Sequence, residues 1–277
     1  QHPRPADPEY PVRPKLLAAL AAAPMLLLPA AAPAGAAPAA RYAALGDSYA
    51  AGVGAGAYDP PSAGCHRSTR SYPELWRAAN GPAEFLFAAC NGAATADVER
   101  DQVPRVPADT TLVTLTVGGN DVGFGDAVVA CLQPLTTDAY CDGALDESER
   151  RLREELPGRL DTLYRALDAV APAARVVVTG YPHLLGTDAT CLIGTAARRA
   201  RFNALTDALD GLIERQAAKQ GFRFADVRAD FEGHGACRGG SDEWIHPITL
   251  PLWESYHPKA AGQSGGYLPS VSAAALG

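Results

Sequence analysis

Five short apolar runs along the chain predict β-strands that are buried on both faces. Each run is continuous and does not alternate with polar residues, which is typical of strands in a parallel sheet covered by helices. The runs lie at 42–45, 84–89, 111–117, 175–179 and 223–227, and the last of them is the weakest.

Two longer segments between these runs have the spacing of amphipathic helices. Segment 147–170 carries leucines close to a period of 3.6, and Pro157 predicts either a kink or the true start of the helix. Segment 196–220 has the same spacing, and Gly221 after it is a predicted C-cap. Strands that alternate with helices predict a doubly wound α/β fold, in which a central parallel sheet forms the middle layer of an α/β/α sandwich.

The N-terminal segment has the pattern of an export signal. Basic residues precede an apolar stretch at 16–28, and two A-x-A sites follow at 34–36 and 37–39. A basic start, an apolar stretch and small residues at a cleavage site are the parts of a secretory signal peptide. We therefore predict an upstream segment and signal peptide in residues 1–39 and a single secreted domain in residues 40–277.

A transmembrane anchor is the alternative interpretation of the same stretch. Pro24, Pro29 and Pro33 interrupt it, and it is short for a span of about 20 residues. Residues 1–12 lie upstream of the basic start, and we give them no role in the fold. No later segment of the sequence suggests stable membrane insertion.

Charge and glycine spacing exclude two classes of partner. The chain has 24 basic and 31 acidic residues, a formal net charge of −7, whereas nucleic-acid binders present a basic face. The glycines in segment 52–56 have the spacing G-x-G-x-G, which is not the G-x-G-x-x-G of dinucleotide-binding loops. We expect no nucleic acid and no cofactor.

Six cysteines favour disulfide bonds, because an even number is typical of exported chains. They allow 15 pairings, among which the sequence does not choose. Consecutive pairing closes short to medium loops and is the one we expect. None of the cysteines lies in a C-x-x-C motif and no histidine has zinc-ligand spacing, so we expect no metal. The three expected pairs are Cys65–Cys90, Cys131–Cys141 and Cys191–Cys237.

Three of the predicted strands end in small and polar residues. The tripeptide Gly-Asp-Ser ends at Ser48, Cys-Asn-Gly ends at Gly92, and Gly-Gly-Asn ends at Asn120. In open parallel sheets, ligands bind beyond the carboxyl ends of the strands. If the strands are neighbours, these three residues converge on one site.

The three residues match the needs of a serine nucleophile. A serine hydroxyl requires a base, most often histidine, and the oxyanion that it creates requires preorganised donors. The backbone N–H groups of Ser48 and Gly92 and the side-chain amide of Asn120 can supply three donors. Taken alone, Gly-Asp-Ser at 46–48 is most often a turn or a helix N-cap, and Asn-Asp at 120–121 is compatible with a turn. A G-x-S-x-G elbow is absent, because Ala50 stands where its second glycine would be.

Two histidines are candidates for the base, since His246 and His257 both end an E-x-x-H-P sequence. Pro258 precedes a Lys-Ala-Ala-Gly segment that can begin a helix, and proline is well placed at a first helical position. The residues after Pro247 do not start a helix comfortably. We therefore favour His257 as the base, with Glu254 as the carboxylate that orients its ring.

These motifs together resemble the four blocks of the SGNH (GDSL-type) hydrolases. The blocks are Gly-Asp-Ser-Tyr at 46–49, Gly92, Gly-Gly-Asn-Asp at 118–121, and His257, whose H-P-x-x-x-G pattern ends at Gly262. They occur in the right order along the whole chain after the signal segment. The resemblance is greatest to secreted actinomycete esterases, lipases and phospholipases, which also carry three disulfides, and it implies a flavodoxin-like fold.

Two positions depart from the family pattern. Tyr49 replaces the leucine of the family name, at a position that varies between apolar and aromatic residues. Glu254 stands where the family usually has aspartate, and some secreted members use a backbone carbonyl instead. The carbonyl of Trp253 or of Ser255 is therefore the alternative orienting group for His257.

The resemblance implies a secreted serine hydrolase that cleaves carboxylic esters through an acyl-serine intermediate and acts as a monomer on a small-molecule or lipid ester. The loops near Tyr49, Phe124 and Trp253 are expected to form the acyl pocket, where apolar residues would suit fatty-acyl esters. A carbohydrate O-deacetylase is the alternative enzyme, and a non-catalytic binding module on the same fold is the alternative of another class. Asp47 and Asp121 are expected to form structural hydrogen bonds with neighbouring backbone.

Overall fold

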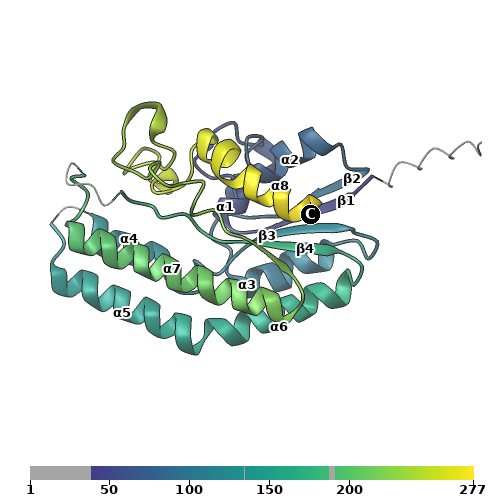
Figure 1. Cartoon of the computed structure of the whole chain (residues 1–277), viewed down its shortest axis with the longest axis horizontal. Helices are drawn as coiled ribbons and strands as arrows, with labels where there is room; N and C mark the ends of the chain where they lie inside the picture. The colour runs from purple at the N-terminus through teal and green to yellow at the C-terminus, as the bar shows by residue number, and fades with distance from the viewer. Residues whose placement is uncertain (1–38, 134, 187–190) are drawn as a thin grey trace, which may run out of the picture. The chain divides into compact units, whose positions relative to one another are not determined.

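In the part of the chain that the structure describes, a five-stranded parallel sheet forms the centre of the fold (Figure 1). The structure is a computed structural model that describes residues 39–133, 135–186 and 191–277. The predicted signal peptide, apart from residue 39, lies outside these residues. The strands, in their spatial order, are β2 (Glu84–Phe87), β1 (Arg41–Gly46), β3 (Leu112–Thr116), β4 (Arg175–Thr179) and β5 (Arg223–Ala225).

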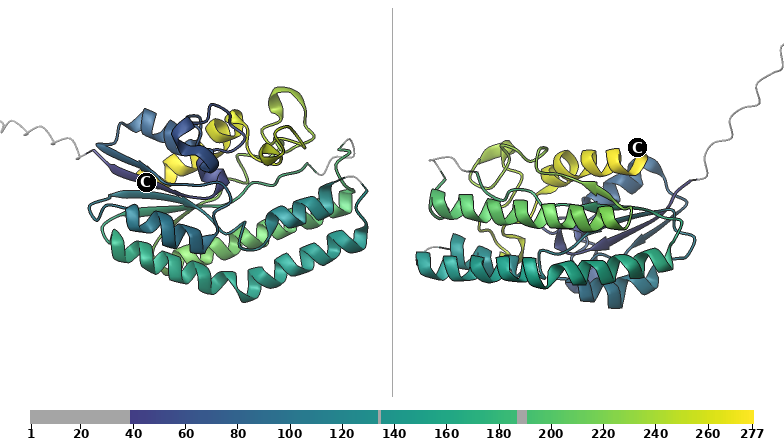
Figure 2. Two further views of the ribbon diagram at one scale, coloured as in Figure 1. Left: turned by 180° about the vertical axis from the view of Figure 1, so that it is seen from behind. Right: turned by 60° about the horizontal axis from the view of Figure 1, so that its bottom comes forward.

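Helices cover both faces of this sheet, as the views in Figures 1 and 2 agree. On one face lie α2 (Tyr72–Asn80) and α8 (Leu268–Leu276). On the other lie α3 (Thr95–Asp97), α6 (Leu156–Val170) and α7 (Ala196–Lys219). The predicted three-layer α/β/α sandwich is confirmed.

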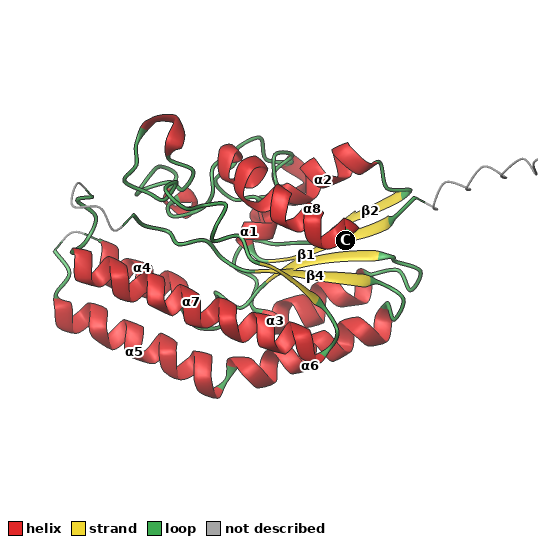
Figure 3. Cartoon of the chain, viewed as in Figure 1, coloured by secondary structure: helices red, strands yellow, loops and turns green. Residues whose placement is uncertain are grey.

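Loops predominate beyond the carboxyl ends of the strands, and the remaining helices lie there or continue the helices already named (Figure 3). The longer ones are α4 (Phe124–Leu132) and α5 (Asp138–Glu154), which pack beside the first half of α7. The short helical turns are α1 (Ser48–Ala51), η1 (Pro60–Cys65), η2 (Val98–Gln102), η3 (Val103–Arg105), η4 (Gly240–Asp242), η5 (Leu252–Glu254) and η6 (Gly262–Tyr267). None of the helices in the described residues is long and apolar enough to cross a bilayer.

The hydrophobic pattern located all five strands to within two residues at either end. It also located α7, whose chain turns at Gly221 with a φ of +72°. The helix expected over 147–170 is in fact two helices, because α5 ends at Glu154 and α6 begins at Leu156. Pro157 has no N–H and so favours the first turn of a new helix over the interior of a continuous one.

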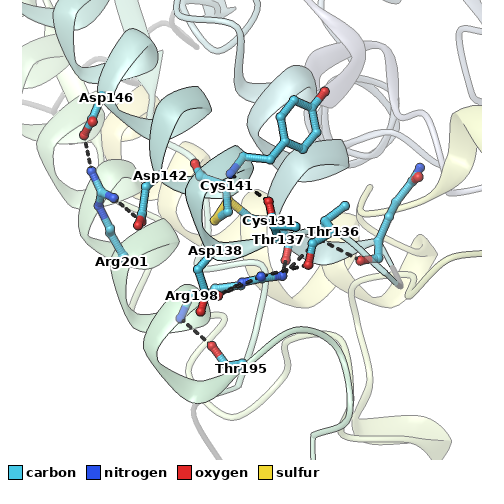
Figure 4. Close-up of a disulfide and its surroundings, with 12 residues drawn as sticks. Cys131, Thr136, Thr137, Asp138, Cys141, Asp142, Asp146, Thr195, Arg198 and Arg201 are labelled. Carbon is cyan, nitrogen blue, oxygen red and sulfur yellow. Dashed lines mark hydrogen bonds and ion pairs between the residues drawn. A yellow bond between two sulfur atoms is a disulfide. The ribbon is translucent and has the colours of Figure 1, made fainter.

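The six cysteines form the three consecutive pairs expected from the sequence. All three disulfides join loops or helix ends on the side of the sheet where the strands end. Around Cys131–Cys141, Figure 4 shows Arg198 and Arg201 of α7 reaching to the α4–α5 connection and to α5. Arg198 bonds to Asp138 and to the carbonyl of Thr136, so side-chain bonds and a covalent link hold the same segment.

Gly46 ends β1 in a conformation that only glycine adopts without strain. Its φ is +124°, and a Cβ built on it would lie 2.1 Å from the backbone oxygen of Thr116 in β3. The side-chain amide of Gln102 holds both polar groups of this residue. Its Oε1 accepts from Gly46 N–H at 2.8 Å, and its Nε2 donates to the Gly46 carbonyl at 2.9 Å. The chain therefore leaves the sheet at Gly46 with no unpaired backbone group.

We predict that Gly46→Ala lowers the free energy of unfolding by about 3 kcal/mol, since it adds left-handed strain and an overpacked contact with Thr116. Gly158→Ala is the control: Gly158 lies in α6, has no neighbour within 4 Å of a built Cβ and has helical φ. That substitution should be neutral or stabilise by up to about 1 kcal/mol. Urea unfolding measures both. Equal effects of the two substitutions would contradict this account of Gly46.

Candidate active site

Ser48 lies at the start of a helical turn at the carboxyl end of the central strand β1. The preceding residue, Asp47, is the N-cap of α1, and its Oδ1 accepts from the N–H of Tyr49 at 2.9 Å. The N–H of Ser48 has no intrahelical acceptor at this position, so it is available to a ligand. Ser48 is 6 % exposed, so its hydroxyl is held in a shielded position.

His257 is the histidine that the structure brings to Ser48. Its Nε2 lies 2.7 Å from Ser48 Oγ, and its Nδ1 lies 3.1 Å from the backbone oxygen of Ser255. An Nδ1–H donated to that carbonyl leaves Nε2 free to accept the serine proton. Burial lowers the pKa of His257 to about 4, opposed by the bond to Ser255, so the ring is neutral at neutral pH.

The two E-x-x-H-P segments pair with each other. The N–H of His246 donates to the carbonyl of His257 at 3.0 Å, and the N–H of Tyr256 donates to the carbonyl of His246 at 3.0 Å. The ring of His246 points to another loop, where its Nε2 lies 2.8 Å from the carbonyl of Gly54. The structure therefore gives the similar sequences different places, and only His257 contacts Ser48.

The expectation that Glu254 orients His257 is not met by the geometry. Glu254 Oε1 accepts a hydrogen bond of 2.6 Å from the hydroxyl of Tyr58. That hydroxyl also accepts from the N–H of Gly54, so Glu254 holds the loop after α1. The short turn η5 directs the Glu254 side chain to this loop, and the carbonyl of Ser255 takes the position beside the imidazole. The backbone alternative is the one that the structure contains.

Gly92 and Asn120 lie at the ends of the two segments that flank β1. Asn120 Nδ2 donates to the carbonyl of Ala93 at 2.9 Å, which places its amide next to Gly92. Both residues are exposed, and Gly92 has a φ of +79° with open space around its α-carbon. Its N–H bonds to no residue that the structure describes. These two groups and the N–H of Ser48 are the donors available for an oxyanion.

Tyr181, which follows β4, is a site residue that the sequence analysis missed. Its hydroxyl donates to Asp47 Oδ2 at 2.5 Å and accepts from the N–H of Gly119 at 3.1 Å. One buried hydroxyl thus joins the turn that holds Ser48 to the turn that holds Asn120. No local motif marks this tyrosine, because its two partners come from different strands of the sheet.

The two aspartates of the motifs have the structural roles expected of them. Burial raises the pKa of Asp47 to about 7, although the bonds from Tyr181 and Tyr49 oppose the shift. Asp121 accepts from the N–H and the hydroxyl of Thr95, at 2.9 and 2.6 Å, and so fixes the start of α3 to the end of β3. Neither carboxylate bonds to His257.

A cavity of about 110 Å³ opens beside Ser48 and His257. Its apolar lining comes mainly from the turn after β1, from α4 and from the segment after β4. The residues are Tyr49, Phe124, Val128 and Leu184. Residues of the loop near Trp253, among them Ser255 and Tyr256, line this cavity, whereas the Trp253 ring itself stacks on His66 with 4.0 Å between ring centroids. Within the described residues, no group of three histidine, cysteine or acidic side chains could hold a metal ion.

Comparison with known proteins gives consistent matches. The model of the GDSL-like Lipase/Acylhydrolase family matches residues 44–264. A lipase of Streptomyces rimosus is 44% identical over 234 residues, covering 84% of this chain and 86% of that protein. Lipase 1 of Streptomyces coelicolor is 44% identical over 235 residues, with the same shares of the two chains.

Two solved structures have the same fold as this chain. The extracellular lipase of Streptomyces rimosus has a TM-score of 0.81 and 44% identity, covering 85% of this chain and all of that one. The phospholipase A1 of Streptomyces albidoflavus NA297 has a TM-score of 0.82 and 44% identity, covering 86% of this chain and all of that one.

We predict that Tyr181→Phe lowers kcat by about 10- to 100-fold with little change in KM, because it releases both turns and small misplacements of reacting groups are costly. Tyr164→Phe is the matched control, since the Tyr164 hydroxyl is buried with no partner among the described residues. It should leave kcat unchanged. Steady-state kinetics on a soluble ester measures both, and an equal response of the two variants would refute the bridging role.

For pH, we predict that kcat/KM is lost as the pH falls through about 4, where the buried His257 takes up a proton and can no longer accept one from Ser48. Glu254→Gln keeps an acceptor for Tyr58 and should leave both kcat and this acid limb unchanged. A pH–rate profile of the two proteins tests this. A displaced acid limb in the variant would show that Glu254 acts on the imidazole.

Proposed function

The chain belongs to the GDSL-like lipase/acylhydrolase family and is a carboxylic ester hydrolase; from this premise we propose that it is a secreted enzyme that cleaves lipid acyl esters through an acyl-serine intermediate. One observation carries the mechanism. The 2.7 Å contact between Ser48 Oγ and His257 Nε2 lies at the carboxyl edge of the sheet, where ligands of parallel sheets bind.

Acylation begins when Ser48 Oγ attacks the carbonyl carbon of the ester. The hydroxyl proton passes to His257 Nε2 as the new C–O bond forms. The carbonyl of Ser255 accepts the Nδ1–H, which fixes the tautomer and stabilises the imidazolium that results. A backbone carbonyl carries only a partial charge, so it orients the ring without placing a full negative charge beside it.

The tetrahedral oxyanion is stabilised by three donors, the N–H groups of Ser48 and Gly92 and the side-chain amide of Asn120. His257 then returns its proton to the leaving alcohol as the ester C–O bond breaks. Water, activated by the same imidazole, attacks the acyl-serine and releases the carboxylic acid. The serine recovers its proton in this second half of the reaction.

Lipid acyl esters are the proposed substrates because the cavity beside the nucleophile is lined by apolar side chains. Phe124 and Val128 of α4 face Leu184 across this cavity. An acyl chain removes their apolar surface from water, at roughly 25 cal/mol per Å². The names of the similar proteins, lipase and phospholipase A1, agree with this choice.

Export is supported by the N-terminal sequence pattern and by the disulfides. Three disulfides among six cysteines persist in an oxidising compartment and are rare in the cytosol. A related lipase is described as extracellular. We also propose that the enzyme acts as a monomer, since one chain supplies the nucleophile, the base and the oxyanion donors.

The test of the mechanism is substitution at the contact that carries it. Ser48→Ala and His257→Ala should each lower kcat for a p-nitrophenyl ester by at least about 10⁴-fold. His246→Ala should keep activity, because its ring bonds to Gly54 and not to Ser48. Activity that survives Ser48→Ala in pure protein would overturn the proposal.

A series of esters from acetyl to palmitoyl, set beside acetylated sugars, tests the substrate class. Higher kcat/KM for longer acyl chains is the expected result. A preference for the acetylated sugar would make the protein a carbohydrate deacetylase instead.

A further inference from the structure

A second cavity, of about 320 Å³, adjoins the proposed oxyanion site on the side of Gly92. It shares no lining residue with the cavity beside Phe124. Asn91 and Gly92 form one wall, and two arginines, Arg67 and Arg105, form others. The proposed oxyanion donors are thus divided between the two cavities: Ser48 and Asn120 line the apolar one, and Gly92 lines the one that contains the two arginines.

Arg67 is held in place by an aromatic ring and a backbone carbonyl and not by an ion pair. Its guanidinium lies 5.9 Å from the centroid of the Phe87 ring, and its Nη1 donates to the carbonyl of Ala89 at 3.3 Å. It forms no ion pair with any described residue, and neither does Arg105. Burial lowers the pKa of Arg67 and the nearby charge of Arg105 lowers it further, while the charge of Asp59 opposes the shift.

The carboxylates of the same cavity are already engaged elsewhere. Asp97 and Asp101 both line it, and both bond to Arg100, at 2.7 and 2.6 Å. The other oxygen of Asp97 accepts from the N–H of Ala94. The two arginines of the cavity therefore form no ion pair with the carboxylates that line it.

The chemistry of this cavity suits an oxyanion. A guanidinium presents its donors in a planar fork that matches the oxygens of phosphate, and charge-assisted hydrogen bonds of this kind are stronger than neutral ones. The like charges of Arg67 and Arg105 disfavour each other, and an anion bound in the cavity would relieve this repulsion. The exposed N–H of Gly92 lies in the wall of the same cavity.

We propose that this cavity binds the phosphate of a glycerophospholipid, on the alcohol side of the ester that Ser48 cleaves. This proposal rests on the proposed function. The acyl chain occupies the apolar cavity, the ester carbonyl lies at the oxyanion donors, and the glycerol carries the phosphodiester a few bonds further to Arg67 and Arg105. The two arginines select esters whose alcohol bears a phosphate over neutral esters of the same acyl chain.

The test is the double variant Arg67→Gln with Arg105→Gln, assayed on two soluble substrates of equal acyl length. Dihexanoylphosphatidylcholine below its micelle concentration carries the phosphate, and p-nitrophenyl hexanoate does not. The loss of charge-assisted bonds should lower kcat/KM for the phospholipid by about tenfold or more, and leave the neutral ester unchanged. Arg67→Lys with Arg105→Lys should restore part of the loss, because it restores charge without the planar fork.

Arg77→Gln is the matched control. The Arg77 guanidinium lies 5.7 Å from the centroid of the Phe85 ring, and Phe85 lies in β2, the strand that also contains Phe87. Unlike Arg67, Arg77 pairs with a carboxylate, that of Glu74, and does not line the cavity. Both activities should be unchanged in this variant. Thermal unfolding of all variants shows that any loss is not a loss of fold.

Inorganic phosphate distinguishes a site for the lipid from a site for the free ion. It should inhibit phospholipid hydrolysis competitively in the unmodified enzyme and not in the double glutamine variant. Equal loss on both substrates, or no loss on either, would overturn the proposal. The proposal would also be overturned if the double glutamine variant lost its inhibition by phosphate but hydrolysed the phospholipid as fast as the unmodified enzyme. Failure of the proposed function is separate, since the unmodified enzyme would then not hydrolyse p-nitrophenyl hexanoate.

Discussion

The carboxylate of Asp47 is the constraint on which the site depends. It is buried at the edge of the sheet, where an unpartnered charge would be costly, so each of its oxygens must have a donor. One oxygen caps the helical turn of Ser48, and the other takes the hydroxyl of Tyr181. Because the same hydroxyl accepts from Gly119, a single buried acid sets the distance between the nucleophile and the turn that carries Asn120.

A second set of long-range contacts brings the C-terminal segment to this edge. Tyr49, the neighbour of the nucleophile, donates its hydroxyl to the carbonyl of Tyr256 at 3.0 Å. Gln263 joins the same region to both Tyr49 and Tyr72 through its side-chain amide. Tyr256 has a φ of +61°, an uncommon conformation for a non-glycine residue, and the turn there carries the ring of His257 toward Ser48. His257 is therefore positioned in part by Tyr49, which lies in the same helical turn as the nucleophile Ser48.

Long-range contacts also fasten the residues that precede α7 to the rest of the fold. Arg199 is almost fully buried and donates to the carbonyls of Gly186, Cys191 and Ile193. The Cys191–Cys237 disulfide links this segment to the loop after β5. These carbonyl oxygens accept from a guanidinium that would be costly to bury without hydrogen bonds. These hydrogen bonds and the disulfide restrict the long loops beyond the carboxyl ends of the strands.

Local patterns in the sequence determined much of this protein. Apolar runs located the strands, because a strand buried on both faces must be apolar throughout, and the order of motifs placed Ser48, Gly92 and Asn120 at one edge. The residues after Pro258 can begin a helix and those after Pro247 cannot, which favoured His257, the histidine that contacts Ser48. These features depend on short stretches of chain, so they can be read from residue types and spacing.

The tertiary structure alone decided which groups support the site. The group beside the His257 imidazole is a backbone carbonyl, which every residue possesses and which therefore leaves no mark in a sequence. Glu254 has the residue type and the spacing expected for that role, but its carboxylate accepts a hydrogen bond from Tyr58 instead. Tyr181 and Gln102 act across many residues of chain, through bonds to turns that follow other strands. Such contacts depend on how the sheet is assembled, and only the folded chain brings their atoms together.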